Sequence, residues 1–178
     1  MLKFLARDAE TGRIGTYQAG FVIPNLNKED KRIPISSVVL SNQRAELKDA
    51  LYNANKDKDK SETANPLVQN RQKLIPSVTR VFSRRRNMFV YLQAYEQGVT
   101  AAQPLIAFVT FYRAATKAFE TTPVEIRSGW SNRLNTMPLS FEIALSFLPV
   151  GKYDCQVSVL SPNLGKVAFW RAPVMVVP

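Results

Sequence analysis

The stretch GKYDCQV (residues 151–157), with the four residues after it, decides the fold. Every second residue is apolar: Tyr153, Cys155, Val157 and Val159. The residues between them are polar: Asp154, Gln156 and Ser158. Successive side chains of a strand point to opposite faces, so the first set is expected in a core and the second in solvent. A tyrosine two residues before a cysteine is typical of one strand of an immunoglobulin-type sandwich.

Similar runs recur along the chain, separated by turns with Gly and Pro. We expect extended segments at 2–7, 14–24, 35–41, 77–83, 87–96, 104–114, 117–126, 138–148, 152–161 and 167–177. Both faces of 87–96 and 104–114 are apolar, which predicts central strands, whereas 117–126 is more polar and predicts a pair of edges around Pro123. In 138–148 one side is expected to hold Phe141, Ile143, Leu145 and Phe147. The pattern predicts an all-β chain with an immunoglobulin/fibronectin-III-like β-sandwich.

The cysteine and tyrosine of the opening stretch are candidate core residues. Cys155 is the only cysteine, so no disulfide can form within the chain. No histidine is present to activate it, and we expect a buried, inert thiol. For Tyr153 two interpretations stand side by side, a tyrosine corner closed by its hydroxyl and a plain core aromatic.

Three regions are expected along the sequence. Residues 1–24 form a β-hairpin, and residues 77–178 form the sandwich. Residues 25–76 connect them and carry a short strand at 35–41 and a charged insertion at 42–72. Within the insertion NQRAELKDALYNAN (42–55) favours a short helix, and 55–64 is expected to be a solvated tip without a core role.

The first and last hairpins resemble each other. When Gly12-Arg13 is laid on Gly165-Lys166, Tyr17 meets Trp170 and the apolar exits both end in proline. Chance similarity between two hairpins is the competing explanation. A genuine repeat predicts that residues 1–24 belong to a preceding or neighbouring sandwich. The opening MLKFLARDAE fits this, because it looks like the later part of a strand.

Composition excludes several kinds of chemistry. Without histidine, Ser-His and Cys-His nucleophiles and His-ligated metals are absent, and one cysteine cannot form a Cys-rich zinc site. Glu120 and Glu125 flank TTPV, but nothing in the sequence holds two carboxylates at the spacing that hydrolysis needs. We therefore expect no catalytic residues, no metal site, no cofactor and no enzyme activity.

Charge suggests a second kind of site. Lys and Arg number 24 against 14 acidic residues, a net charge of +10 that favours anionic partners, although it also suits a self-repelling, soluble surface. The densest basic cluster is Arg80, Arg84, Arg85 and Arg86, a candidate anion site whose plain alternative is a solvated hairpin turn. Nucleic acid is not expected, since no recognisable binding motif is present.

Neither a membrane span nor an export signal is predicted. No apolar run approaches the ~20 residues needed to cross a bilayer. The N-terminus has too short an apolar stretch and no small-residue cleavage site for a signal peptide.

Several stretches together carry a family resemblance: DAETGRIGTYQAGFVIPNL, ISSVVLSNQ, PSVTRVFSRRRNMFVYLQAYE, FYRAATKAFETTPVEI and LPVGKYDCQVSVLSPNLGKVAFWRAPVMVVP. They resemble the C-terminal region of acidobacterial proteins with a von Willebrand A-related domain. The resemblance implies an exported bacterial protein, secreted, periplasmic or at the cell surface, whose tail consists of β-sandwich modules. The metal-site motif D-x-S-x-S does not occur in this chain, so no metal ligand carries over.

Two functions are expected from these observations. The first is a non-catalytic structural or interaction module in adhesion, assembly or spacing, with residues 1–24 pairing with a neighbouring domain or with another subunit in a homo-oligomer. The alternative is a binding domain for an anionic ligand such as an acidic polysaccharide, through a basic surface that includes Arg84–Arg86.

Overall fold

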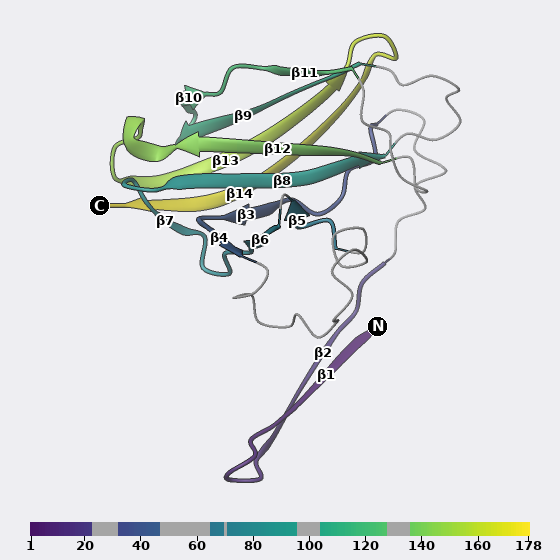
Figure 1. Ribbon diagram of the computed structural model, residues 1–178, viewed down its shortest axis with the longest axis vertical. Helices are drawn as coiled ribbons and strands as arrows, with labels where there is room; N and C mark the ends of the chain where they lie inside the picture. Colours follow the sequence, from purple (N-terminus) through teal and green to yellow (C-terminus); the bar gives the residue numbers. More distant parts are fainter. Residues whose placement is uncertain (23–31, 47–64, 70, 96–103, 128–135) are drawn as a thin grey trace.

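The computed structural model describes residues 1–22, 32–46, 65–69, 71–95, 104–127 and 136–178. These residues form an all-β protein with two sheets packed face to face, a small side sheet and a separate hairpin (Figure 1). The predicted all-β sandwich is confirmed.

The larger of the two packed sheets has six strands, and we call it the large sheet. Its order is β10 (Thr116–Glu120), β9 (Leu105–Arg113), β13 (Gly151–Ser161), β14 (Lys166–Val177) and β7 (Val81–Ser83), and β11 (Val124–Ile126) also pairs with β9. All neighbours are antiparallel except β14 and β7, which are parallel. β9 is central, and β10 and β11 lie at its edge, as predicted.

The facing sheet, here the small sheet, has three antiparallel strands. β8 (Asn87–Tyr95) lies between β12 (Thr136–Ala144) and β3 (Val39–Ser41), so its prediction as a central strand is also confirmed. Beside β3 lies the side sheet, with β4 (Gln43–Glu46), β6 (Gln72–Ile75) and β5 (Val68–Gln69). The Ser41 hydroxyl donates to the carbonyl oxygens of Gln43 and Ile75 and so joins the side sheet to β3.

The core lies between the two packed sheets. The large sheet contributes Val109, Phe111, Cys155 and Val157, and the small sheet contributes Met88, Val90, Leu92, Met137 and Leu139, all at most 1% exposed. The inward set predicted for β13 is confirmed, because Tyr153, Cys155, Val157 and Val159 are all buried. Ser158 was expected in solvent but is 1% exposed, since its register partners on the outer face are two aromatic residues, Phe108 and Phe169.

Two local predictions are wrong. Phe147 was expected on the core side of a strand, but β12 ends at Ala144 and the 3-10 turn η2 (Leu145–Phe147) breaks the alternation. Phe147 is therefore 74% exposed and stacks on Phe119, with ring centroids 6.4 Å apart.

The other error concerns the first part of the predicted helix at 42–55, whose remaining residues, 47–55, lie outside the described residues. Gln43–Glu46 is strand β4, because pairing with β6 overrides the helix propensity of these residues. Residues 47–64, which include the predicted tip at 55–64, lie outside the described residues. One apolar residue of the insertion, Val68 on β5 of the side sheet, is nevertheless buried.

Candidate interaction surfaces

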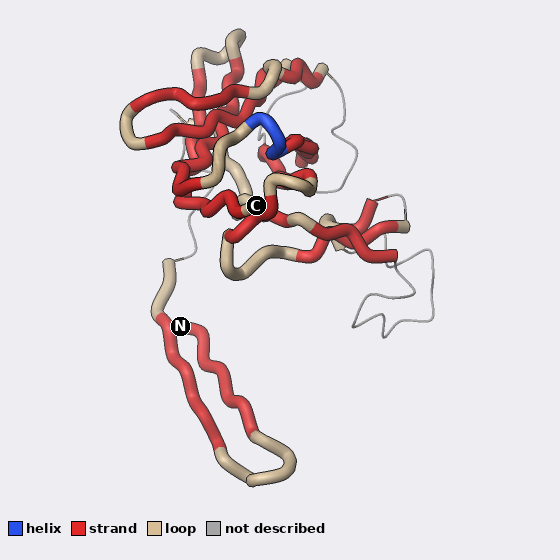
Figure 2. The backbone as a smooth tube through the Cα atoms, turned by 90° about the vertical axis from the view of Figure 1, so that its left-hand side faces the viewer, coloured by secondary structure: helices blue, strands red, loops and turns tan. Residues whose placement is uncertain are grey.

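The hairpin of β1 (Leu2–Arg7) and β2 (Ile14–Ala19) projects from the sandwich in both views (Figures 1 and 2). The predicted hairpin is thus present, and its six residue pairs run from Leu2–Ala19 to Arg7–Ile14. Every described residue of β1 is exposed, and β2 is exposed except at Ala19, which is partly buried. The sandwich therefore leaves the hairpin almost uncovered.

One face of this hairpin is apolar, and we call it the hairpin face. Opposite residues of an antiparallel pair share a face, so the register defines it: Leu2, Phe4, Ala6, Gly15, Tyr17 and Ala19. The rings of Phe4 and Tyr17 are opposite each other, with centroids 6.4 Å apart, and remain 57% and 63% exposed. Pattern reasoning predicted the strands but not this face as a site, although the alternation in LKFLAR contains the signal.

The turn of this hairpin matches the turn between β13 and β14. Four residues, 9–12 and 162–165, separate the closing pairs, which are Asp8 with Arg13 and Ser161 with Lys166. The fourth residue is glycine in both, with φ of +70° at Gly12 and +61° at Gly165, a conformation that costs other residues about 1–2 kcal/mol. The two hairpins can therefore be aligned residue by residue, although the Gly12 amide donates to the Asp8 carbonyl oxygen and the Gly165 amide to that of Pro162.

This alignment pairs exposed residues with buried ones. Leu2, Phe4 and Ala6 correspond to Cys155, Val157 and Val159, all buried in the core. Tyr17 corresponds to Trp170, which packs against that core. The hairpin face thus corresponds to the face of β13 and β14 that the small sheet covers.

The predicted basic cluster is divided by β7. Arg80 precedes this strand and Arg84–Arg86 follow it, which separates their backbones by about 13 Å at roughly 3.3 Å per residue. The turn at 84–86 leads from β7 in the large sheet to β8 in the small sheet, so it is not a hairpin turn.

Only some of these arginines are free for a ligand. The Arg84 guanidinium donates to the carbonyl oxygen of Ser146 at 2.8 Å, so it holds the turn against η2. Arg85 and Arg86 are exposed, with backbone amides that donate to Ser83. Arg80 is exposed as well but lies on the other side of β7, so the adjacent charges available for an anion are those of Arg85 and Arg86.

Tyr153 and Cys155 both lie in the core. The Tyr153 hydroxyl donates to the Pro149 carbonyl oxygen, four residues upstream, at 2.7 Å, the contact that a tyrosine corner makes. Burial raises the pKa of the Cys155 thiol to about 12, which keeps it protonated and weakly reactive near neutral pH.

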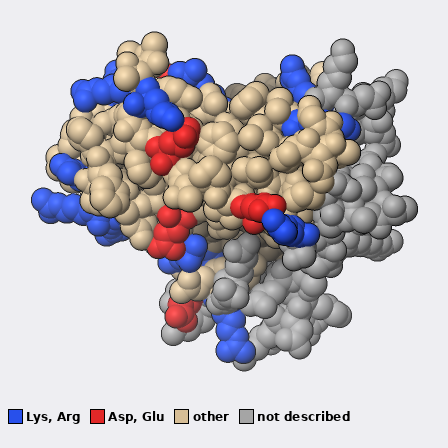
Figure 3. Space-filling view, turned by 90° about the horizontal axis from the view of Figure 1, so that it is seen from above, with Lys and Arg blue, Asp and Glu red and all other residues tan. Residues whose placement is uncertain are grey.

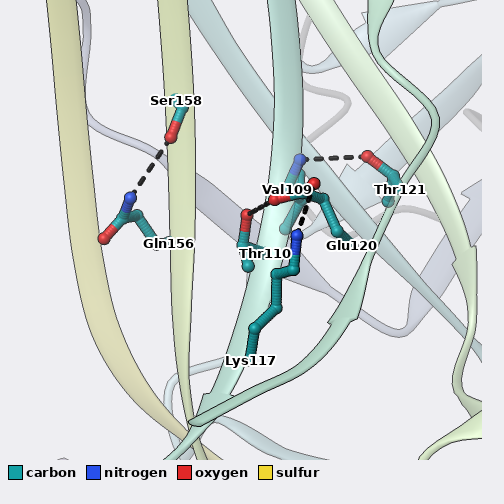
Figure 4. Close-up of polar contacts among 7 residues, drawn as sticks. All are labelled: Val109, Thr110, Lys117, Glu120, Thr121, Gln156 and Ser158. Atoms are coloured by element: carbon teal, nitrogen blue, oxygen red, sulfur yellow. Dashed lines mark hydrogen bonds and ion pairs between the residues drawn. The ribbon is translucent and has the colours of Figure 1, made fainter. Parts of the chain in front are cut away.

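The carboxylates Glu120 and Glu125 are held apart and separately paired. Their register partners on β9, Thr110 and Ile106, are four residues apart, about 13 Å along the strand. Glu120 accepts hydrogen bonds from the Thr110 hydroxyl at 2.9 Å and the Lys117 ammonium at 3.1 Å, and these, the hydroxyl first, lower its pKa (Figure 4). Glu125 pairs with Arg127 at 3.0 Å, so the two carboxylates do not converge on one position.

Charges on the face in Figure 3 are dispersed. Basic side chains lie at separate points around its rim, with acidic side chains between them. Among the residues that the structure describes, no three His, Cys, Asp or Glu residues gather in a way that could hold a metal ion. A search of the same residues finds no helix of the length and apolarity needed to cross a membrane.

Comparison with known proteins finds no family model that matches this chain and no curated protein that it matches.

Proposed function

We propose that this chain is a non-catalytic β-sandwich module that acts by binding a neighbouring domain or subunit through the hairpin of β1 and β2. The observation that carries the proposal is the uneven distribution of exposed apolar side chains. Of the 16 large apolar residues exposed in the described part of the chain, eight lie within residues 1–22: Met1, Leu2, Phe4, Leu5, Ile14, Tyr17, Phe21 and Val22. Exposed apolar surface concentrated in this way is typical of interaction sites.

The free backbone edges of the hairpin support the same function. A two-stranded hairpin is at best marginally stable alone in water, and its edges present unpaired N–H and C=O groups. Addition of a strand to such an edge is a common mode of protein recognition.

The strand order supports an immunoglobulin-like form of the sandwich. β9, β13 and β14 are arranged like strands C, F and G, and β8 and β12 like strands B and E of the facing sheet. The hydroxyl contact of Tyr153 fits that arrangement. From the resemblance to von Willebrand A-related proteins we propose that the module serves adhesion, assembly or spacing in an exported bacterial protein.

Deletion of residues 1–22 tests whether the hairpin is an interaction element. We expect the truncated chain to keep the melting temperature and the free energy of unfolding of the full chain, because the described sandwich buries almost nothing of the hairpin. A clear loss of stability would show that the hairpin belongs to its own sandwich and would overturn the proposal. Hydrolase turnover that disappears in Glu120→Gln or Glu125→Gln would overturn the non-catalytic part.

Binding of an anionic ligand is the second candidate, favoured by the exposure of Arg85 and Arg86. Replacing both with serine while keeping Arg84 should release the protein from heparin at lower salt without changing its stability. The matched control replaces Arg32 and Lys166, which lie toward the opposite end of β14 from β7. Equal elution of the two double variants would exclude the 84–86 turn as the site.

A further inference from the structure

Building on the proposed function, we propose that the partner of the hairpin is a second copy of this chain, which pairs antiparallel with β1 about a two-fold axis at Phe4. The result is a four-stranded sheet in the order β2–β1–β1–β2. Three properties carry the inference: which edge is open, which register avoids like charges, and what the resulting sheet gains.

The turn determines which backbone groups of β1 are free. The Asp8 amide donates to the Arg13 carbonyl oxygen at 2.9 Å, so this pair is hydrogen-bonded. Hydrogen-bonded and non-hydrogen-bonded pairs alternate along an antiparallel ladder. The backbone groups of Lys3, Leu5 and Arg7 therefore point away from β2, and β1 contains no proline to interrupt this edge.

The second hairpin indicates that the first strand is the one that takes a partner. β13, the equivalent of β1, pairs antiparallel with β9 along seven residues. Among the described residues, the segment of β14 that corresponds to β2 (167–172) pairs with β13 and otherwise has only the isolated bridge between Val167 and Arg32. β7 joins β14 further along, at Met175–Val177. Val157, the equivalent of Phe4, lies opposite Val109 in the β13–β9 ladder.

The sequence of β1 is complementary to itself about Phe4. In that register no two charged side chains are opposite each other; the opposed pairs are Phe4 with Phe4, Lys3 with Leu5, Leu2 with Ala6, and Met1 with Arg7. Phe4 then forms a non-hydrogen-bonded pair, where opposite Cα atoms lie about 4.5 Å apart and aromatic residues stabilise pairing.

Neighbouring registers are less favourable. An axis at Leu5 places Lys3 opposite Arg7, and an axis at Lys3 places that lysine opposite itself. Like charges directly opposite each other destabilise a strand pair. An axis at Ala6 places Asp8 opposite Phe4.

Pairing with a second copy gives the hairpin enough strands for a stable sheet. Four strands with one apolar face exceed the three that independent stability requires, whereas two strands do not reach it. The two hairpin faces become one continuous apolar surface. The net charge of +10 on each chain opposes association, so dimerisation should strengthen with added salt, whereas binding to a polyanion should weaken.

A single introduced cysteine tests the register. Under mild oxidation Phe4→Cys should form a disulfide-linked dimer about tenfold faster than Thr16→Cys, because Cβ atoms of a directly opposite pair lie near disulfide reach. Thr16 is a matched control, exposed like Phe4 but on β2. The native thiol of Cys155 is buried and does not interfere.

Outcomes of this experiment separate the two proposals. Equal rates for the two variants, or a monomeric wild-type mass by light scattering at millimolar concentration and high salt, would overturn pairing with a second copy. The proposed function would survive that result if deletion of residues 1–22 leaves stability unchanged. A loss of stability in that deletion would remove the function and this inference together.

Discussion

Two hairpins of this molecule share a turn, a register and an alternation of apolar residues, yet their surroundings differ completely. In the hairpin of β13 and β14 the apolar face meets the small sheet, and Val157 is fully buried. In the hairpin of β1 and β2 the equivalent Phe4 is 57% exposed. Local sequence therefore specifies a hairpin, whereas burial of its apolar face depends on whether a partner surface is present.

At equivalent positions of the two hairpins, a side chain should contribute very different amounts to the free energy of unfolding. A fully buried apolar side chain contributes about 1.5–3 kcal/mol by leaving water, and its loss also creates a cavity. An exposed one contributes little to the stability of the monomer. Matched substitutions in the two hairpins therefore test whether burial determines what each position contributes to stability.

The largest expected effect comes from introducing a charge. Val157→Asp should cost more than about 4 kcal/mol and prevent folding, because an unpaired carboxylate would be buried in the core. Phe4→Asp should change the free energy of unfolding of the monomer by less than about 0.5 kcal/mol. Circular dichroism at low protein concentration shows whether each variant folds, and urea unfolding measures the stability of Phe4→Asp. A folded Val157→Asp variant, or a Phe4→Asp variant that also fails to fold, would contradict the assigned surroundings.

A smaller effect is expected at the turn glycines. Gly165→Ala should destabilise the sandwich by about 1–2 kcal/mol, because alanine disfavours positive φ. A Cβ at this position meets nothing within 4 Å, so the cost is conformational and not steric. Gly12→Ala should leave the melting temperature unchanged and weaken only the β1–β2 pairing, which nuclear magnetic resonance would detect.

Removal of one hydroxyl should have a slightly smaller effect. Tyr153→Phe deletes the hydrogen bond to Pro149 and should cost about 1 kcal/mol. Tyr17→Phe is the control in the first hairpin and should have no effect on thermal unfolding of the sandwich. Equal behaviour of the two variants would argue against a structural role for the Tyr153 hydroxyl.

The smallest expected effect is pH-dependent. The hydrogen bonds from Thr110 and Lys117 lower the pKa of Glu120 in the folded chain. The contribution of Glu120 to the free energy of unfolding is therefore fully present above the ordinary pKa of 4.5 and is lost as pH falls through the lower folded value. Glu120→Gln should therefore be slightly less stable than wild type at pH 7, and the difference should shrink below pH 4.5. Thr110→Val should reduce the same pH dependence, and an unchanged profile in both variants would exclude the interaction.

Much of the fold could be predicted from period-2 alternation. The central strands β8 and β9, the edges around Pro123 and the inward face of β13 follow from residues that repeat at a fixed spacing. Phe147 was misplaced because alternation does not show where a strand stops, and η2 begins one residue after Ala144. Gln43–Glu46 was misassigned because its strand depends on β6, which lies far along the chain.

The interaction surface was only partly accessible from sequence. The repeat identified the hairpin, but alternation in LKFLAR is compatible with a buried or an exposed face, and only the fold distinguishes them. The four arginines looked like one cluster because they are close in sequence. β7 separates Arg80 from the others, and the Ser146 carbonyl oxygen engages Arg84.

Amide hydrogen exchange across a range of protein concentrations tests whether the hairpin of β1 and β2 is open in the monomer and becomes covered by a second copy. At low concentration the amides of Lys3 and Leu5 should exchange rapidly, while those of β13 are strongly protected. At high concentration and high salt, Lys3 and Leu5 should become protected as β1 acquires a partner. Strong protection of β1 at every concentration would contradict the account, because the hairpin would then be covered by its own chain.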